Sequence, residues 1–353
     1  MRDCDLAQNK DAAPRNRVSR SISLRDLGKH LGLSPTTVSL VLNGSPAAAS
    51  IPKETQDRIF AAAKSLNYRP NFFARSLRSR RTYLVGVMLP ELSEGYASLV
   101  LSGIEDALLV KDYVYLVTSH RHKPELIDRA PRLLCERCVE GIIAVDTPLT
   151  QELPVPVVSI SGHEHIPGVT NIVLNHVSAA ELGLRHLIQL GHQRIAIFKG
   201  LSFSSDSEVR FNAIVSAAGL LGLELHDRLI VPLQGDSPSP EVGYSAARQL
   251  LGSGEDFTAL WAFNDISAIG AVRALIEAGK HVPRDVSVLG FDDVNSAKFH
   301  NPALTTVRQP LARMGAVAAE TLLARIAQST QDVPAEISVE PELVVRESTA
   351  PVT

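Results

Sequence analysis

Short apolar runs alternate with helix-forming segments along residues 83–348, and this alternation restricts the fold more than any other feature of the sequence. Runs such as YLVGVML (83–89), GIIAV (141–145) and RIAIFKG (194–200) have the length and composition of buried strands. Segments between the runs, such as AIGAVRALIEAGK (268–280), favour helices. Strands alternating with helices indicate parallel sheets, and the length of the region indicates two of them.

The amino-terminal part of the chain differs from this region in charge. Residues 1–82 contain 15 Lys and Arg against 6 Asp and Glu, a net charge of +9, although the whole chain of 353 residues carries −3. The rest of the chain therefore carries −12. A basic head on an acidic body indicates a polyanionic partner for the head alone, and a solvated basic tail is the alternative.

Two short helices joined by a tight turn are predicted within the basic head. Leu24, Leu27 and Leu31 recur with the spacing of one helix face, and Gly32 stands where that helix would end. The stretch SPTTVSLVLNG (34–44) then begins with a good N-cap and a proline suited to the first helical position. This pattern predicts a helix-turn-helix, with a helix pair buried in a larger core as the alternative.

The second helix of such a motif lies in the major groove of DNA, with its first residues at the base edges. Thr37, Ser39 and Asn43 suit phosphate contacts, whereas Pro35, Thr36 and Leu40 are expected to face the bases. Together with the capping Ser34, these seven residues form the predicted DNA-contacting set.

SPTTVSLVLNG followed by LNYRPNFFARSLRS (66–79) resembles the DNA-binding head and hinge of the LacI/GalR family of bacterial transcription regulators. The resemblance implies a hinge helix, here from Phe72 to about Arg78, that pairs with its dimer partner in the minor groove. It implies that Leu77 wedges into a base step, with Ala74 and Arg75 beside it. The chain departs from the family pattern at Leu40. It also departs in the loop SPAAASIPKET (45–55), which is longer than usual and leads to a third predicted helix, KETQDRIFAAAKSL (53–66).

The resemblance continues through HLIQLGHQRIAIFKG (186–200) and VPRDVSVLGFDD (282–293). It implies a core like a periplasmic sugar-binding protein, with two Rossmann-like parallel-sheet subdomains, crossovers near Asn175, Thr306 and Val333, and a ligand cleft between them. The predicted organisation is a tail (1–20), a helix-turn-helix head (21–70), a hinge (71–82), a core (83–348) and a second tail (349–353). Within the core, residues 83–175 and 307–333 form one subdomain, and 176–306 and 334–348 form the other.

Five residues match positions that the family uses to bind its effector. They are Tyr96, Asp146, Arg210, Asn264 and Asp292. An arginine fork and an amide suit sugar hydroxyls, and a carboxylate can accept from two adjacent hydroxyls. For each acid, a helix cap or a surface charge is the alternative. Asn175 and Ser237 depart from the family pattern and leave the ligand type open.

Motifs of other functional classes are missing or weak. No G-x-G-x-x-G or P-loop follows a strand, and no nucleophile motif is present, so neither an enzyme nor a cofactor is expected. Cys135 and Cys138 have no second pair at zinc-site spacing, and the histidines of 120–122 and 163–165 are expected in solvated loops. No metal site is predicted.

The sequence thus predicts a DNA-binding transcriptional regulator, a repressor, acting as a homodimer on pseudo-palindromic operator DNA in the cytoplasm. Its expected effector is a small carbohydrate, as inducer or as corepressor. A periplasmic-type sugar receptor without DNA function is the alternative, which the helix-turn-helix and the lack of an apolar leader segment disfavour.

Overall fold

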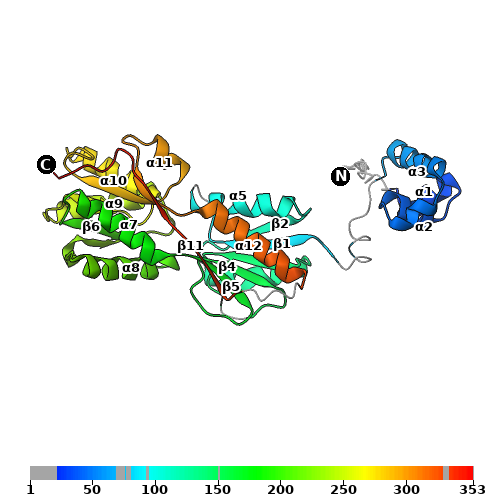
Figure 1. The fold of residues 1–353 in the computed structure, drawn as a ribbon, viewed down its shortest axis with the longest axis horizontal. Helices are drawn as coiled ribbons and strands as arrows, with labels where there is room; N and C mark the ends of the chain where they lie inside the picture. The colour runs from blue at the N-terminus through cyan, green and yellow to red at the C-terminus, as the bar shows by residue number, and fades with distance from the viewer. Residues whose placement is uncertain are drawn as a thin grey trace, which may run out of the picture. The chain divides into compact units, whose positions relative to one another are not determined.

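The computed structural model divides into two compact units, and the division of the chain falls between Arg81 and Thr82 (Figure 1). It describes residues 22–68, 76, 81–92, 95–149, 152–328 and 334–352. Across these ranges, no helix combines the length and the apolar character that a membrane span requires.

The smaller unit is helical. Its elements are α1 (Leu24–Leu31), α2 (Pro35–Leu42), the 3-10 helix η1 (Pro46–Ser50) and α3 (Lys53–Ser65). Ser23 caps α1 in a capping box with Asp26, and Ser34 caps α2 by accepting from the backbone N–H of Thr37. These caps satisfy backbone donors that helices so short cannot satisfy internally.

The turn between α1 and α2 depends on two glycines. Gly32 ends α1 with a φ of 68°, and a Cβ on Gly28 would lie 2.8 Å from the carbonyl oxygen of Leu33. The close approach lets one residue from each of the three α-helices meet without solvent exposure, namely Leu27, Val38 and Ile59. The predicted helix-turn-helix is therefore a packed three-helix unit, with η1 in the loop before α3.

The larger unit contains two lobes, each built on a six-stranded sheet. The first sheet is parallel, with strand order β11-β5-β4-β3-β1-β2. Its strands are β1 (Leu84–Leu89), β2 (Val114–Ser119), β3 (Gly141–Val145), β4 (Val157–Ile160), β5 (Val169–Leu174) and β11 (Glu336–Val339). The helices of this first lobe are α5 (Tyr96–Leu109), α6 (Pro124–Glu136) and α12 (Leu311–Ile326).

The second sheet has the order β12-β10-β9-β8-β6-β7, and only β12 runs antiparallel to its neighbour. Its strands are β6 (Ile195–Lys199), β7 (Ile230–Pro232), β8 (Ala259–Trp261), β9 (Ser287–Asp292), β10 (Thr305–Arg308) and β12 (Glu342–Val344). The helices of this second lobe are α7 (His176–Gln189), α8 (Asp206–Leu221), α9 (Pro240–Gly252), α10 (Asp265–Glu277) and α11 (Asn295–Phe299), with the 3-10 helix η2 (Asp227–Leu229).

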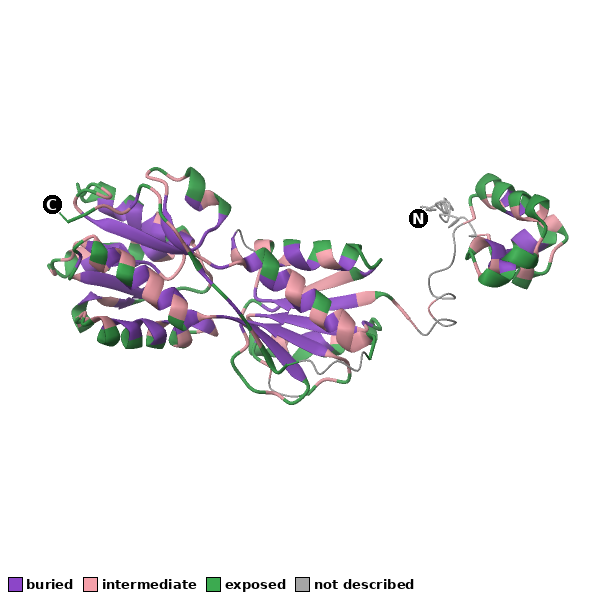
Figure 2. Ribbon diagram, in the orientation of Figure 1, coloured by how far each residue is buried: buried purple, intermediate pink, exposed green. Residues whose placement is uncertain are grey.

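Both sheets are buried between helices, which explains why their strands are apolar runs rather than alternating patterns (Figure 2). In the first lobe, α5 and α12 pack closely because each contributes a glycine. A Cβ on Gly103 would lie 1.7 Å from the carbonyl oxygen of Ala312, and one on Gly315 would lie 2.1 Å from that of Val100. The expected architecture of two Rossmann-like lobes beside a helical head is confirmed.

The chain crosses between the lobes three times. The first crossing lies at Asn175, between β5 and α7. The second follows Arg308, because β10 pairs with β9 through that residue, two residues beyond the expected position near Thr306. The position near Val333 is outside the described residues and is wrong, because β11 beyond it still pairs with β5. The third crossing therefore lies between Val339 and Glu342.

The last described residues belong to the second lobe rather than forming a tail at 349–353. The backbone N–H of Ala350 donates to Ser287 Oγ at 3.0 Å, and that of Val352 donates to the carbonyl of Leu190 at 2.9 Å. Because these bonds tie the segment to β9 and to the end of α7, it extends the packed structure of the lobe.

Candidate functional site

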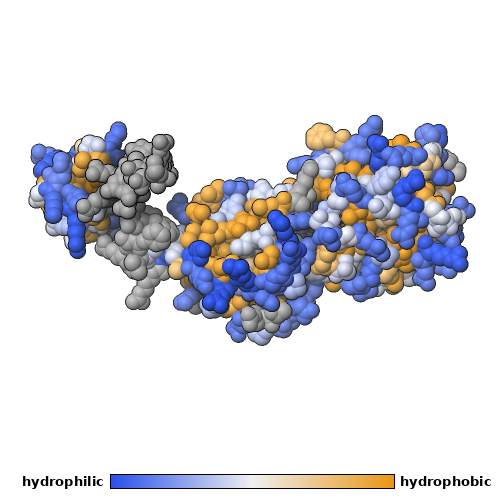
Figure 3. Space-filling view, turned by 180° about the vertical axis from the view of Figure 1, so that it is seen from behind, coloured by the Kyte–Doolittle hydropathy of each residue, from blue (hydrophilic) through white to orange (hydrophobic). Residues whose placement is uncertain are grey.

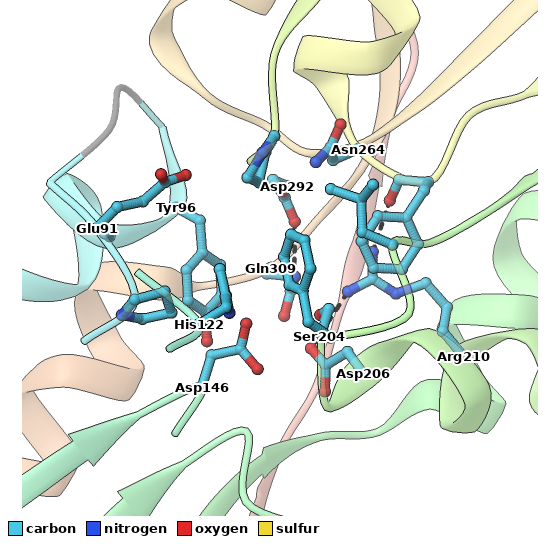
Figure 4. A pocket seen from close by; sticks show the side chains of 16 residues that line it. Glu91, Tyr96, His122, Asp146, Ser204, Asp206, Arg210, Asn264, Asp292 and Gln309 are labelled. Carbon is cyan, nitrogen blue, oxygen red and sulfur yellow. Dashed lines mark hydrogen bonds and ion pairs between the residues drawn. The ribbon is translucent and has the colours of Figure 1, made fainter. Parts of the chain in front are cut away.

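A cavity lies between the two lobes, where strands of both sheets end (Figure 4). It encloses about 630 Å³, including the mouth that opens to solvent. Pro90, Glu91, Tyr96, Ala97, His122 and Asp146 line it from the first lobe. Leu201, Phe203, Ser204, Asp206, Arg210, Pro238, Phe263, Asn264 and Asp292 line it from the second, and Gln309 from the second crossing.

All five predicted effector-binding residues face this one cavity. Tyr96 begins α5, Asp146 follows β3, Arg210 lies in α8, Asn264 caps α10 and Asp292 ends β9. They come from five separate segments of the chain, and the carboxyl ends of parallel strands bring them together. Their role in binding stays a prediction, since the structure shows their position and not a ligand.

Arg210 is held rigidly in the wall of the cavity. Its guanidinium carbon lies 3.7 Å from the ring centre of Phe291 and 4.4 Å from that of Phe263. One terminal nitrogen donates to the carbonyl of Phe263 at 2.6 Å, and the other lies 3.3 Å from Asp206 Oδ2. Because stacking and hydrogen bonds fix its plane, the fork is already oriented when a ligand arrives.

Asp292 is almost completely buried and is positioned by Gln309, whose Nε2 donates to its Oδ1 at 2.6 Å. Burial raises the pKa of Asp292 to about 6, although Arg210 and the bond from Gln309 act in the opposite direction. Its φ of 104° is unusual for a residue with a side chain. Asp146, which lines the cavity, and Ser161 also follow strands with positive φ, of 40° and 56°. Backbone strain of this kind concentrates at functional sites.

Contacts across the cavity join the two lobes. Ser205 of the second lobe donates to Asp146 Oδ1 from its backbone N–H at 3.0 Å and from its hydroxyl at 2.5 Å. The ring of His122, from the first lobe, stacks on that of Phe203, from the second, with centroids 3.6 Å apart. The structure therefore represents a state in which the lobes touch.

Asp206 was not among the predicted residues, although it interacts with more of the site than any residue that was. Its Oδ2 receives bonds of 3.3 Å from Ser161 Oγ and from Arg210, and its Oδ1 faces His163 and His176. Burial opposes its ionisation, but the two histidines and Arg210 outweigh burial and hold its pKa well below the usual range. The spacing Asp206-x-x-x-Arg210, one helical turn, was the available signal.

The loop of His163 and His165 is exposed as expected, whereas His120 and His122 of the other loop are not solvated. His120 is buried with its Nε2 3.0 Å from Thr147 Oγ1, and burial together with His122 lowers its pKa to about 4. His122 lines the cavity, and the His163 side chain points to Asp206 at 2.7 Å. In the second loop, both His163 and His165 are exposed. For His120 and His122 the expectation failed because loop composition does not tell where a loop folds back.

Asn264 serves two roles. Its Oδ1 accepts from the backbone N–H of Ser267 at 2.9 Å as the N-cap of α10, and the residue also lines the cavity. The cap fixes the side chain through its oxygen, so the amide NH₂ is the group placed to donate to a ligand.

In the helical unit, six of the seven predicted DNA-contacting residues of the head are at least partly accessible to solvent. The exposed ones are Ser34, which also caps α2, Pro35, Thr36 and Asn43, and the half-buried ones are Thr37 and Leu40. Ser39 is buried, and Asn43 Nδ2 donates to both its carbonyl and its hydroxyl. Ser39 therefore also stabilises α2, and its expected contact with phosphate stays a prediction. Ala74, Arg75, Leu77 and the predicted hinge helix lie outside the described residues.

Two family models match the chain. The model for bacterial regulatory proteins of the lacI family matches residues 23–71, and the model for a periplasmic binding protein-like domain matches residues 184–349. The HTH-type transcriptional repressor PurR of Haemophilus influenzae (strain ATCC 51907 / DSM 11121 / KW20 / Rd) is 30% identical over 338 residues, which cover 92% of this chain and 98% of the relative.

Solved structures of similar proteins agree with these matches. The lac repressor dimer bound to operator and the anti-inducer ONPF is 26% identical with a TM-score of 0.83, covering 94% of this chain and 100% of that one. The complex of the transcriptional regulator CelR with cellobiose is 26% identical with a TM-score of 0.68, covering 93% and 99%. Similarity therefore spans both the helical unit and the two-lobed unit.

Proposed function

The chain belongs to the lacI family of bacterial regulatory proteins, and from this premise we propose that a small neutral carbohydrate binds in its interlobe cavity and sets its affinity for operator DNA. The protein is a DNA-binding repressor with a ligand-binding core. A receptor without DNA function is disfavoured, because the lacI model matches the helical unit of this same chain.

The observation that carries the proposal is the convergence of Arg210, Asn264 and Asp292 on one enclosed cavity. The three side chains supply fixed donors and an acceptor, which is what a polyhydroxylated ligand needs. The rings of Tyr96 and Phe203 add flat apolar surface that can cover the face of a sugar. The cellobiose complex of CelR supports this ligand class, since that regulator shares the fold and 26% of its residues.

Effector binding is coupled to DNA binding through the lobes. A ligand that contacts both lobes stabilises the closed arrangement, which the bonds between Ser205 and Asp146 already define. Moving a two-state equilibrium from about 1% to about 99% of one state requires a differential affinity of about 5.5 kcal/mol. The linker that leads to the head enters the first lobe before β1, so a change in that lobe is passed to the head.

On the DNA side, we propose that α2 reads the operator through its exposed amino-terminal residues. Pro35 and Thr36 are exposed there, and neither is needed for the core of the helical unit. Ala74, Arg75 and Leu77 are proposed to act in the hinge, on the family pattern. Because the head binds a polyanion, its affinity should fall steeply with salt concentration, and the protein acts where operator DNA lies, in the cytoplasm.

A homodimer is proposed, with the first lobe at the interface. Apolar side chains gather on one face of this lobe (Figure 3). Leu109, Val110 and Val114 are 59%, 78% and 59% exposed, where α5 ends and the edge strand β2 begins. An exposed apolar edge strand is unfavourable in a monomer, and a second copy would cover it. A dimer also matches a pseudo-palindromic operator.

The proposal is tested with the full chain by calorimetry against carbohydrates and nucleobases, followed by fluorescence anisotropy on a selected operator. We expect one carbohydrate to bind and to change operator affinity at least tenfold, with the sign showing whether it is inducer or corepressor. Arg210→Lys keeps the charge but removes the fork, and should weaken effector binding by about tenfold or more. Arg185→Lys, on the exposed face of α7, is the matched control.

Two results would contradict the proposal. One is a panel in which no carbohydrate binds, and the other is an Arg210→Lys protein that responds to the effector like the wild type.

A further inference from the structure

Three potential metal-binding side chains meet beside the effector cavity. His163 Nε2 lies 2.7 Å and His176 Nε2 lies 3.3 Å from the same atom, Asp206 Oδ1. The possible ligand atoms of the three residues all lie within 4.8 Å of one another. His176 and Asp206 are buried, with side chains 5% and 6% exposed, whereas His163 is an exposed residue whose side chain is 23% exposed, so an ion could reach the cluster from its side.

The three residues come from both sides of the cleft. His163 lies in the loop between β4 and β5 of the first lobe, whereas Asp206 begins α8 of the second lobe. His176 begins α7, directly after the first crossing at Asn175. An ion held by all three would therefore join the lobes at a point close to the hinge.

The hydrogen bonds around the cluster leave Asp206 Oδ1 and the ring of His176 able to bind an ion. Arg210 and Ser161 engage the opposite oxygen of Asp206, which orients the carboxylate while Oδ1 faces the histidines. Among the described residues, His176 Nδ1 is buried without a hydrogen-bond partner, so no bond from behind prevents the ring from turning toward an ion.

The charge around the cluster favours a cation. Four carboxyl groups line the adjoining cavity, those of Glu91, Asp146, Asp206 and Asp292, against the single guanidinium of Arg210. Burial, and to a lesser extent the charge of Asp206, raise the pKa of Asp146. A divalent ion would offset the excess of carboxyl groups.

We propose that His163, His176 and Asp206 bind one divalent transition-metal ion, best matched by Zn²⁺, and that the ion holds the lobes closed. Two imidazole nitrogens and one carboxylate oxygen are a ligand set that Zn²⁺ uses where one position stays open. Ligand atoms about 2.0–2.2 Å from a tetrahedral ion lie roughly 3.3–3.5 Å apart. The separation of His176 and Asp206 already fits, and His163 needs only a small withdrawal once the ion replaces its proton.

The ion acts as a second input to the repressor, separate from the carbohydrate. Because its ligands come from both lobes, it binds the closed arrangement in preference to the open one and shifts the population accordingly. Metal binding itself does not rest on the proposed function, since it needs neither effector nor DNA.

The test measures Zn²⁺ binding to the full chain after removal of metals, by competition with a chromophoric chelator and by thermal melting. We expect one ion per chain and a raised melting temperature. His163→Ala should weaken binding by at least tenfold and abolish the thermal shift. His165→Ala is the matched control, because it removes an exposed histidine two residues away in the same loop.

Two further measurements separate a built site from surface binding. The Co²⁺-loaded protein should show the intense visible absorption of a four-coordinate ion, and His163→Ala should lose it. Asp206→Asn should weaken binding as well, with circular dichroism used to check that it is folded. The proposal is overturned if no Zn²⁺ binds, or if His163→Ala and His165→Ala bind it equally.

Discussion

Asp265 offers a sharp test of the electrostatics of the second lobe. It begins α10, is completely buried, and accepts from Thr306 Oγ1 at 2.7 Å and from the backbone N–H of Val294 at 2.9 Å. Burial and the neighbouring charge of Asp292 raise its pKa from 3.8 to about 8, although both hydrogen bonds oppose the shift. Asp265→Asn keeps the shape, because its oxygen can accept from Val294 while its NH₂ donates to Thr306.

The direction of the effect follows from proton linkage. Between pH 3.8 and about 8 the folded protein holds a proton on Asp265 that the unfolded chain has released. The free energy of unfolding therefore falls as pH rises, by about 1.4 kcal/mol per pH unit from this group. Asparagine removes that dependence. From pH 6.5 to 8, Asp265→Asn should gain about 1.6 kcal/mol relative to the wild type, because Asp265 is already half ionised at the upper end of this range.

Urea unfolding followed by fluorescence measures this difference, because the single tryptophan, Trp261, is buried in β8 of the same lobe. Starting at pH 6.5 keeps the titration of Asp292, with a pKa of about 6, largely out of the window. Asp256→Asn, at an exposed position in the same lobe, should leave the pH dependence unchanged. The reasoning would be refuted if the free energies of unfolding of Asp265→Asn and of the wild type changed equally with pH.

Three other changes have effects that follow directly from contacts in the structure. Ser34→Ala removes the cap of α2 and should cost the helical unit about 1 kcal/mol, measured by thermal melting, with weaker operator binding. Gly103→Val should prevent α5 from packing on α12, because its Cβ would meet the carbonyl oxygen of Ala312, and should leave little folded protein by size-exclusion chromatography. Phe203→Ala removes the stacking partner of His122 and should speed effector release in stopped-flow measurements, without altering DNA binding in the absence of effector.

Local sequence signals were sufficient for most of the fold. The run GIIAV became β3 over the same residues, Gly141–Val145, because a strand buried on both faces must be apolar throughout. The cap at Ser34 and the turn at Gly32 likewise predicted the helix-turn-helix. Such signals could not predict which of the two sheets a short strand joins. Residues 336–339 alternate as an edge strand does, and nothing local says that they pair with β5 rather than with the second sheet.

The cavity was predicted only in part. Residues that follow strands could be placed at it, since parallel strands end at one edge, and the family resemblance selected five of them. Side chains that reach it from loops could not be found in this way. His163 and Asp206 are separated by 43 residues, and their contact depends on how closely the two lobes approach. The burial of Ser39 could not be predicted either, because in a helix of eight residues a small polar side chain can turn inward when Asn43 donates to it.

The charges in the cavity also restrict the effector. Arg210 is already paired with Asp206, whose pKa lies well below its usual range. The positive charge of Arg210 is therefore largely neutralised within the protein. Asp292 has a pKa of about 6 and is mostly ionised at neutral pH. A phosphate or carboxylate on the effector would add negative charge beside Asp292, where the described lining residues offer no cationic side chain other than the paired Arg210. A neutral hydroxyl can instead donate to Asp292 and accept from Asn264, and for this reason the cavity favours an uncharged sugar over a sugar phosphate.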